Sequence, residues 1–316
     1  MSLQNTSPLT AVFVIPPSVH LLDITGPAHV FYEAASYGAP VKLVFSTMFS
    51  DETESVSTSS LAFQKLVPYD QLQLTRGDLI FVPGLDSGLL DSTAFLARSR
   101  SFLKWITKQH EDGVITASVC TGAFLLAAAG LLEGRSCTTH WKYVDRMRAL
   151  YPGINLLDNR LFVQEDRIYT SAGVSSGIDL ALYLVEQLWG PQFAAQIAKE
   201  VLIYFRRTPE EPQLNIYTQY RNHLDHRIHQ VQDMLLQSMK TPSDLEAISV
   251  KVNMSVRNLT RSFKKTTGIT IGEYLERLRV EQAKKLLDEG QTMSAAATAC
   301  GLKSTHQLRQ VLKRFA

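Results

Sequence analysis

Short apolar runs alternate with helical patterns over the first 190 residues. Most of the runs are bounded by Pro, Gly or Asp, as buried strands are, and Glu165 and Asp166 separate two of them as the tight turn of a hairpin. This alternation predicts a doubly wound, mainly parallel sheet with helices on both faces. The predicted strands are Ala11–Ile15, Val41–Ser46, Leu79–Val82, Val114–Ser118, Arg160–Gln164 and Arg167–Ser171. The predicted helices are Pro27–Tyr37, Thr93–His110, Ala123–Leu131, Ser175–Leu188 and Gln192–Tyr204.

The strand patterns stop at a polar stretch with two prolines, RRTPEEPQ at 206–213. Because this stretch lacks the apolar periodicity needed to join a core, we expect a linker at 206–220. It would separate an α/β domain at 1–205 from an all-α domain at 221–316. The helices expected in the second domain are His223–Met239, Pro242–Val252, Ser255–Thr266, Gly272–Asp288, Ser294–Cys300 and Ser304–Phe315.

Two segments of the all-α domain share a helix–turn–helix plan. Ser255 and Ser304 each stand where an N-cap opens the second helix of a pair. In each second helix the apolar residues fall on one face, and basic or amide side chains occupy the other. The outward residues include Arg257, Thr260, Arg261, Lys264 and Lys265 in the first pair, and His306, Arg309, Gln310 and Lys313 in the second.

The charge is divided unevenly along the chain. The formal net charge is +2, but residues 221–316 hold 16 Lys and Arg against 9 Asp and Glu, a net +7, and residues 1–220 carry a net −5. No acid occurs between Lys251 and Thr267. A chance excess of solvated cations would also give a basic half, but two basic helix–turn–helix patterns favour double-stranded DNA as its partner.

Residues 221–316 resemble the AraC-type DNA-binding domain. The shared pattern runs from Met254 to Gly268 (M-S-x-R-x-L-x-R-x-F-K-K-x-x-G), through Tyr274 to Arg279, and then over A-A-x-x-C-G-L at 296–302. The resemblance implies two recognition helices joined by a rigid helix. It makes Arg257, Thr260, Arg261, His306, Arg309 and Gln310 candidates for base-edge contacts, with the flanking lysines on phosphates. Leu302 departs from the pattern, because the family usually has Phe there.

A cysteine lies where a strand turns into a helix. Val114–Ser118 leads into Val119-Cys120-Thr121-Gly122 and then into an apolar helix, so Cys120 is expected at the carboxyl end of the sheet. A helix N-terminus there predicts a thiol more acidic than a free cysteine. The loop Pro83-Gly84-Leu85 follows another strand, so the N–H groups of Gly84 and Thr121 are candidate oxyanion donors. Asp23, after the first strand, is a candidate carboxylate.

Residues 10–190 resemble the ThiJ/PfpI group of the class I glutamine amidotransferase-like superfamily. The shared motifs are L-D-I-T-G-P at 22–27, F-V-P-G at 81–84, S-V-C-T-G-A at 118–123 and T-T-H-W at 138–141. The resemblance implies a flavodoxin-like sheet and a bacterial transcription regulator that binds a small polar effector. Family hydrolases often carry His directly after the cysteine, where this chain has Thr121.

Two functions remain open for the α/β domain. As a sensor it would bind an effector through Asp23, Gly84, Leu85, Cys120, Thr121 and His140. As a cysteine-dependent hydrolase or hydratase it would use Cys120 as nucleophile and Asp23 as base. The incomplete catalytic set favours the sensor and a protein that is not an enzyme. For His140 the alternative is a core histidine beside Trp141, and no metal or cofactor is expected.

Composition limits the class of protein and the cellular compartment that we expect. Hydrophobic residues make up 45% and charged residues 20%, an ordinary globular balance. No apolar run approaches the roughly 20 residues that cross a bilayer, and no Lys or Arg precedes Lys42, so the basic start of a signal peptide is absent from the sequence. Three cysteines, an odd count, favour a reducing compartment. We therefore expect a cytoplasmic protein with no membrane partner. The family resemblance implies a nucleoid-associated homodimer, with RNA polymerase as a further candidate partner.

Overall fold

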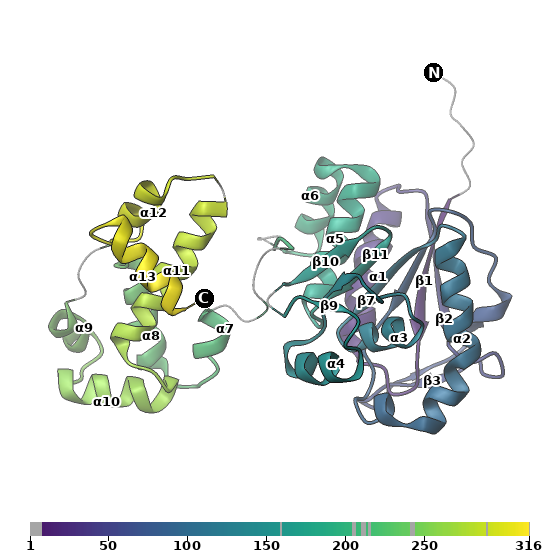
Figure 1. The fold of residues 1–316 in the computed structure, drawn as a ribbon, viewed down its shortest axis with the longest axis horizontal. Helices are drawn as coiled ribbons and strands as arrows, with labels where there is room; N and C mark the ends of the chain where they lie inside the picture. Colours follow the sequence, from purple (N-terminus) through teal and green to yellow (C-terminus); the bar gives the residue numbers. More distant parts are fainter. Residues whose placement is uncertain are drawn as a thin grey trace, which may run out of the picture. The chain divides into compact units, whose positions relative to one another are not determined.

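The chain folds into two compact units, residues 1–213 and 214–316 (Figure 1). The first is an α/β unit and the second is entirely helical. No helix among the residues that the structure describes is long and apolar enough to cross a membrane. The computed structural model describes residues 8–158, 160–203, 207–209, 213, 216–240, 244–288 and 290–315.

The α/β unit is built on a seven-stranded sheet in the order β10-β11-β7-β6-β1-β2-β5. All neighbours are parallel except β10 and β11, which form an antiparallel hairpin. The predicted mainly parallel sheet and its hairpin are therefore confirmed. The strands are β1 (Leu9–Ile15), β2 (Val41–Thr47), β5 (Val67–Pro68), β6 (Leu79–Val82), β7 (Ile115–Val119), β10 (Phe162–Glu165) and β11 (Ile168–Ser171).

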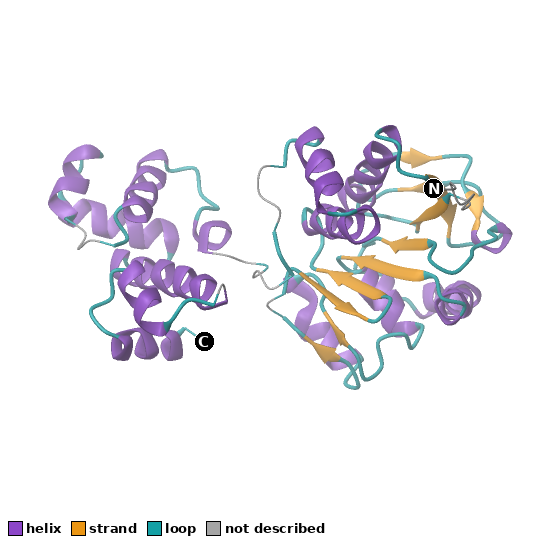
Figure 2. Ribbon diagram, turned by 90° about the horizontal axis from the view of Figure 1, so that it is seen from above, coloured by secondary structure: helices purple, strands orange, loops and turns teal. Residues whose placement is uncertain are grey.

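Helices cover both faces of this sheet (Figure 2). One apolar cluster joins the sheet to α1 (Leu21–Ser36), α5 (Ser176–Trp189) and α6 (Pro191–Glu200). A second cluster joins the other face to α2 (Thr93–Glu111), α3 (Gly122–Ala128) and α4 (Val144–Leu150). Two short pairs, β3 (Ser55–Val56) with β4 (Ala62–Phe63) and β8 (Ser136–Cys137) with β9 (Asn155–Leu156), lie outside the main sheet. The sequence missed these two-residue strands and α4, because so few residues show no periodicity.

The helix α1 begins six residues before the predicted start at Pro27. Proline suits the first position of a helix, which is why the sequence placed the start there. Here Pro27 lies inside the helix, although it cannot donate to the carbonyl oxygen of Asp23 four residues back. Close packing against α5 holds α1 in place, since a Cβ added to Gly26 would lie 2.8 Å from Ile178. Asp23 therefore sits in the first turn of a helix and not in a loop.

The helical unit has two apolar cores that share one helix, α11. Tyr274 and Leu278 of α11 belong to the first core, and Val280 and Ala283 belong to the second. The rigid joining helix that the family resemblance implies is thus present. The helices are α7 (Ile216–Tyr220), α8 (His226–Gln237), α9 (Leu245–Lys251), α10 (Val256–Thr267), α11 (Ile271–Asp288), α12 (Met293–Ala299) and α13 (Thr305–Arg314).

The segment expected to be a linker, 206–220, is divided between the two units wherever the structure describes it. Arg207 and Gln213 make polar contacts with the α/β unit, whereas Ile216 and Tyr220 of α7 are buried in the helical unit. The division of the chain falls between 213 and 214. Apolar periodicity does not reveal this, because the first contacts are hydrogen bonds and α7 is only five residues long. The predicted end of a helix at Tyr204 and start at Pro242 lie outside the described residues.

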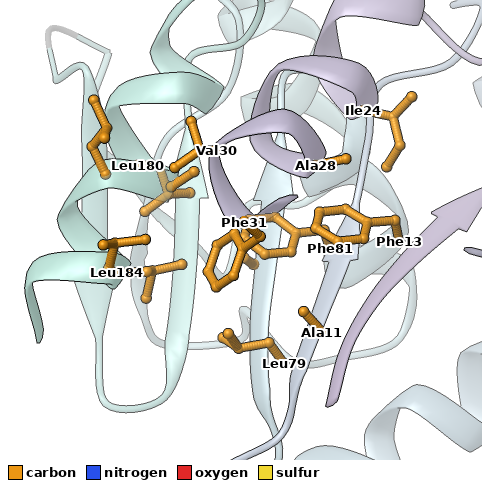
Figure 3. Packing of buried hydrophobic residues seen from close by; sticks show 14 of the residues in the cluster. Ala11, Phe13, Ile24, Ala28, Val30, Phe31, Leu79, Phe81, Leu180 and Leu184 are labelled. Atoms are coloured by element: carbon orange, nitrogen blue, oxygen red, sulfur yellow. The ribbon is translucent and has the colours of Figure 1, made fainter. Parts of the chain in front are cut away.

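The aromatic centre of the α/β unit gives a stability test. Phe13 is 0% exposed and stacks on Phe81 at 5.0 Å between ring centroids, and Phe31 meets Phe81 edge to face (Figure 3). We expect Phe13→Ala to lower the free energy of unfolding of this unit by about 3–5 kcal/mol, since it leaves a cavity. Urea denaturation followed by circular dichroism measures the loss.

Phe45 is the matched control, because it faces Phe13 across the β1–β2 pair but is 39% exposed. Phe45→Ala should cost about 1 kcal/mol or less. Equal losses for the two variants would contradict the packing described here.

Candidate functional site

Cys120 lies at the turn between β7 and α3. Its φ of 58° is in the left-handed region, which is uncommon for a residue other than glycine. Its N–H donates to the carbonyl oxygen of Ser171 at 3.0 Å, and its own carbonyl oxygen accepts from Thr139 Oγ1 at 3.0 Å. The side chain is buried, with the residue 3% exposed. The predicted place of Cys120 at the carboxyl end of a central strand is therefore confirmed.

Asp23 faces this turn from the first turn of α1. The residue is only 1% exposed. Its Oδ1 accepts from the N–H of Val174 at 2.8 Å, and its Oδ2 has no hydrogen-bond partner among the described residues. Gly84 closes the site from the end of β6, because a Cβ there would collide with Asp23 Oδ2. An Oδ2 of this kind is unusual, since buried polar groups normally have hydrogen-bond partners.

A strained loop after β11 completes the site. Gly173 has φ 103° and Val174 has φ 52°, an outlier for a β-branched residue. A Cβ at position 173 would collide with the side chain of Cys120, so only glycine fits this close approach. The sequence analysis missed this loop. The available signal was its position after a predicted strand, the same rule that located Cys120.

Thr121 and Leu85 hold the loops after β6 and β7 together. The hydroxyl of Thr121 donates to the carbonyl oxygen of Leu85 and accepts from its N–H, both at 3.0 Å. Leu85 is fully buried, and both of its backbone polar groups bond to Thr121, so it fixes the loop after β6, and its contact with a ligand stays a prediction. Asp23, Gly84, Cys120 and Thr121 do come together as the sequence predicted.

Two histidines lie at the edge of this site. His20, which the sequence analysis missed, precedes α1 and places Nδ1 3.6 Å from Asp23 Oδ2. Its spacing of three residues before Asp23 was the available signal. His140 caps the short helix Trp141–Tyr143 by accepting from the N–H of Lys142 at 3.3 Å. Burial lowers the pKa of His140, and the charge of Asp23 opposes that shift.

The helical unit contains two capped helix–turn–helix arrangements. Ser255 Oγ accepts from the N–H of Asn258 at 3.3 Å at the start of α10, and Ser304 Oγ accepts from the N–H of Gln307 at 3.2 Å at the start of α13. Each helix buries an apolar face, with Leu259 and Phe263 on α10 and Leu308 and Val311 on α13. The caps and apolar faces are those that the sequence predicted.

The residues of α10 and α13 that the sequence predicts to contact DNA have no acidic partners among the described residues. All nine predicted DNA-contacting residues are exposed: Arg257, Thr260, Arg261, Lys264, Lys265, His306, Arg309, Gln310 and Lys313. Within the described part of the chain none of them forms an ion pair, whereas Arg277 and Arg314 pair with Glu273 and Glu276. Unpaired cations on one helix face suit a polyanion.

Both units match known families. Residues 10–187, more than half of the chain, match the DJ-1/PfpI family. The chain belongs to the DJ-1/PfpI family. Residues 248–316 match the helix-turn-helix domain family. The α/β unit is called the DJ-1/PfpI unit below, and both resemblances drawn from the sequence are confirmed.

Several curated proteins are similar to this chain. The HTH-type transcriptional regulator CdhR of Pseudomonas aeruginosa is 29% identical over 246 residues, 77% of this chain and 71% of that protein. The HTH-type transcriptional regulator GbdR of the same species is 27% identical over 317 residues, 99% of this chain and 83% of that protein. Isonitrile hydratase of Pseudomonas putida is 32% identical over 197 residues, 62% of this chain and 79% of the enzyme.

Solved structures share the fold. An AraC family transcriptional regulator from Pseudomonas putida superposes with a TM-score of 0.52 at 20% identity, covering 62% of this chain and 100% of that one. A ThiJ/PfpI family protein from Pseudomonas syringae gives 0.52 at 21% identity, covering 83% of this chain and 91% of that one. These likenesses support the doubly wound sheet.

The thiol chemistry of the DJ-1/PfpI unit differs from the sequence-based expectation. Burial raises the pKa of Cys120 far above its ordinary value, and the negative charge of Asp23 raises it further. Hydrogen bonding from Thr121 lowers it, but by less. The predicted acidic thiol is therefore wrong, because desolvation and a neighbouring anion outweigh the helix N-terminus. Cys137 and Cys300 are buried as well.

One group of side chains could hold a metal ion. Ligand atoms of His20, Asp23 and Cys120 lie within 4.8 Å of one another, the only such group found among the described residues. Sulfur, nitrogen and oxygen donors suit zinc. However, a metal ion must displace the thiol proton, and the raised pKa of Cys120 opposes that.

The link between Asp23 and the thiol can be tested by alkylation. Asp23→Asn removes the anion, so the pKa of Cys120 should fall and the pH profile of iodoacetamide labelling should move to lower pH. Mass spectrometry of the labelled peptide gives the rate at each pH. Cys137 is the internal control, because burial alone raises its pKa to about 12. An unchanged Cys120 profile would exclude the electrostatic coupling.

Proposed function

We propose that the protein is a sequence-specific DNA-binding transcription regulator. The observation that carries the proposal is the pair of capped helix–turn–helix arrangements, whose outward faces are cationic and free of acids. Such a helix fits the major groove when its back is packed and its front is polar. The helix α11 joins the two, so that both reach one side of the duplex as a unit.

The exposed residues divide by chemistry into two roles. Arg257, Thr260, Arg261, His306, Arg309 and Gln310 can donate to base edges or accept from them. Lys264, Lys265 and Lys313 lie further along the helices and supply charge for phosphates. In the free protein Arg261 donates to Asn258 Oδ1 at 3.2 Å, and Gln310 and His306 share a hydrogen bond at 3.0 Å. These surface contacts are weak enough for DNA to replace.

The DJ-1/PfpI unit is proposed to sense a small polar effector. Asp23 Oδ2 is buried and accepts no hydrogen bond from the described residues, and its ionic neighbour His20 Nδ1 lies 3.6 Å away, so a ligand that donates a hydrogen bond to this oxygen would add an interaction. Cys120, Thr121, Gly84 and His20 surround this oxygen or lie beside it. Ligand-dependent ordering of this site would bias the DNA-bound state.

Hydration or hydrolysis by Cys120 is the second candidate, favoured by the similarity to isonitrile hydratase. Against it stands the raised pKa of Cys120, because a thiolate is the nucleophile. Homodimerisation, contact with RNA polymerase and residence at the bacterial nucleoid accord with regulation and are part of the proposal.

Base reading by α10 can be tested with Arg261. We expect Arg261→Ala in the full chain to weaken binding to the specific operator by about 1–3 kcal/mol, with a smaller effect on random DNA. Fluorescence anisotropy on both duplexes gives the ratio. Arg227→Ala is the control, because Arg227 is an exposed arginine of the same unit but lies on α8. An unchanged ratio for Arg261→Ala would refute base reading.

A metabolite screen can distinguish a unit that only binds an effector from one that also converts it. Amino acids, amines and amides are added to the full chain, and stabilisation on thermal shift identifies a binder. Asp23→Ala should abolish the shift, and mass spectrometry should find the binder unconverted at catalytic protein concentration. Conversion of many equivalents, lost in Cys120→Ser, would overturn the sensor in favour of the enzyme.

A further inference from the structure

The polypeptide that leaves the DJ-1/PfpI unit is fastened to the loops that build its site. We name Arg207, Pro209 and Gln213 the clasp. Gln213 is the last residue of the first unit, so the clasp is the final stretch of chain before the helical unit. Arg207 bonds to Ser175, which follows the residue that contacts Asp23, and Gln213 bonds to Thr139, which contacts Cys120. Between them, Pro209 bonds to Leu161.

Arg207 forms the first arm of the clasp. Its Nε donates to Asp179 Oδ2 at 3.0 Å, its N–H donates to Asp179 Oδ1 at 3.2 Å, and its Nη2 donates to Ser175 Oγ at 2.9 Å. The side chain of Asp179 is only 4% exposed. A buried carboxylate that takes several bonds from one arginine is costly to separate from it. Ser175 directly follows Val174, whose N–H is bound to Asp23.

Gln213 forms the second arm. Its Nε2 donates to Thr138 Oγ1 at 3.0 Å and to the carbonyl oxygen of Thr139 at 2.9 Å. Both threonines are fully buried, and Thr139 Oγ1 in turn donates to the carbonyl oxygen of Cys120 at 3.0 Å. Between the arms, the carbonyl oxygen of Pro209 accepts from the N–H of Leu161 at 3.2 Å, and Leu161 accepts from Ala172 at 2.8 Å, just before the strained loop.

We infer that the clasp couples the state of the Asp23–Cys120 site to the freedom of the connection to the DNA-binding unit. Two independent chains of bonds run from the site, one through Val174 and Ser175 to Arg207, and one through Thr139 to Gln213. Anything that takes the carboxylate of Asp23 away from the N–H of Val174 disturbs the loop that leads to Ser175, which accepts one hydrogen bond from Arg207 directly before the helix that carries Asp179. By linkage, release of the clasp changes the site by an equal free energy.

This inference rests on the proposed regulatory function, but its test uses neither DNA nor effector. Trypsin must take the side chain of Arg207 into its own pocket to cut between Arg207 and Thr208, so that cleavage rate in the full chain reports release of the first arm. Asp179→Asn should raise the rate at least about fivefold, the low end of typical coupling. Mass spectrometry identifies the bond that is cut.

The coupling itself is tested from the site. Asp23→Ala removes the acceptor of the Val174 N–H and should also raise cleavage after Arg207 about fivefold or more. Asp23→Asn keeps an oxygen acceptor and should stay near the wild-type rate. Asp51→Asn is the remote control, because Asp51 pairs with Arg98 on α2. It should leave cleavage after Arg207 unchanged.

The reverse direction provides a second measurement. Asp179→Asn and Gln213→Ala should each speed hydrogen exchange of the Val174 amide. Fast labelling of Cys137 would reveal an Asp23→Ala protein that fails to fold, and the exchange measurement then decides whether the coupling exists. The inference is overturned if a folded Asp23→Ala protein is cleaved at the wild-type rate. It is also overturned if exchange of the Val174 amide is unchanged in both Asp179→Asn and Gln213→Ala. Failure of the proposed function is distinguishable, because it appears as lost DNA or effector binding with these rates unaffected.

Discussion

The carboxylate of Asp23 is the constraint on which the site depends. Burying a charge is costly unless it is paired, and here one oxygen accepts from the N–H of Val174, whereas the other accepts no hydrogen bond from the described residues and lies 3.6 Å from His20 Nδ1. To bring that N–H to the carboxylate, the chain holds Val174 at a positive φ. The same anion raises the pKa of the neighbouring Cys120. Asp23 thus contacts the strained loop, adds to the effect of burial on the pKa of Cys120, and leaves one buried oxygen without a hydrogen bond from the described residues.

The topology of the sheet explains why these groups meet. His20, Gly84, Cys120 and Gly173 follow β1, β6, β7 and β11, which are consecutive neighbours in the sheet. Parallel neighbours end at one edge, where open α/β sheets bind ligands. The clasp is the C-terminal stretch of the DJ-1/PfpI unit, and its residues Arg207 and Gln213 bond to loops at this edge. Site and connection are therefore joined by polar contacts and not by a shared apolar core.

The helical unit holds its two short basic helices on two small apolar cores. Each recognition helix is short and needs an apolar back to hold it, so the chain builds two small cores and shares α11 between them. Neither α10 nor α13 contains an acidic residue, and Glu276 of α11 pairs with Arg314 at the end of α13. Rigidity and cationic charge are supplied by different residues, which allows the outward faces to vary without loss of the fold.

The sequence by itself determined the two-part organisation, the central parallel strands, the capped recognition helices and the position of Cys120. These follow from local patterns: apolar runs, helical spacing, and a serine before each basic helix. Only the tertiary structure decided where α1 begins and that Leu85 is buried. It also decided the contacts of Val174 and His20 with Asp23 and the hydrogen bonds between Arg207 and Asp179. These depend on desolvation and on bonds between residues far apart in the chain, and the acidity of Cys120 was mispredicted for the same reason, since a helix N-terminus can be read from the chain but burial beside an anion cannot.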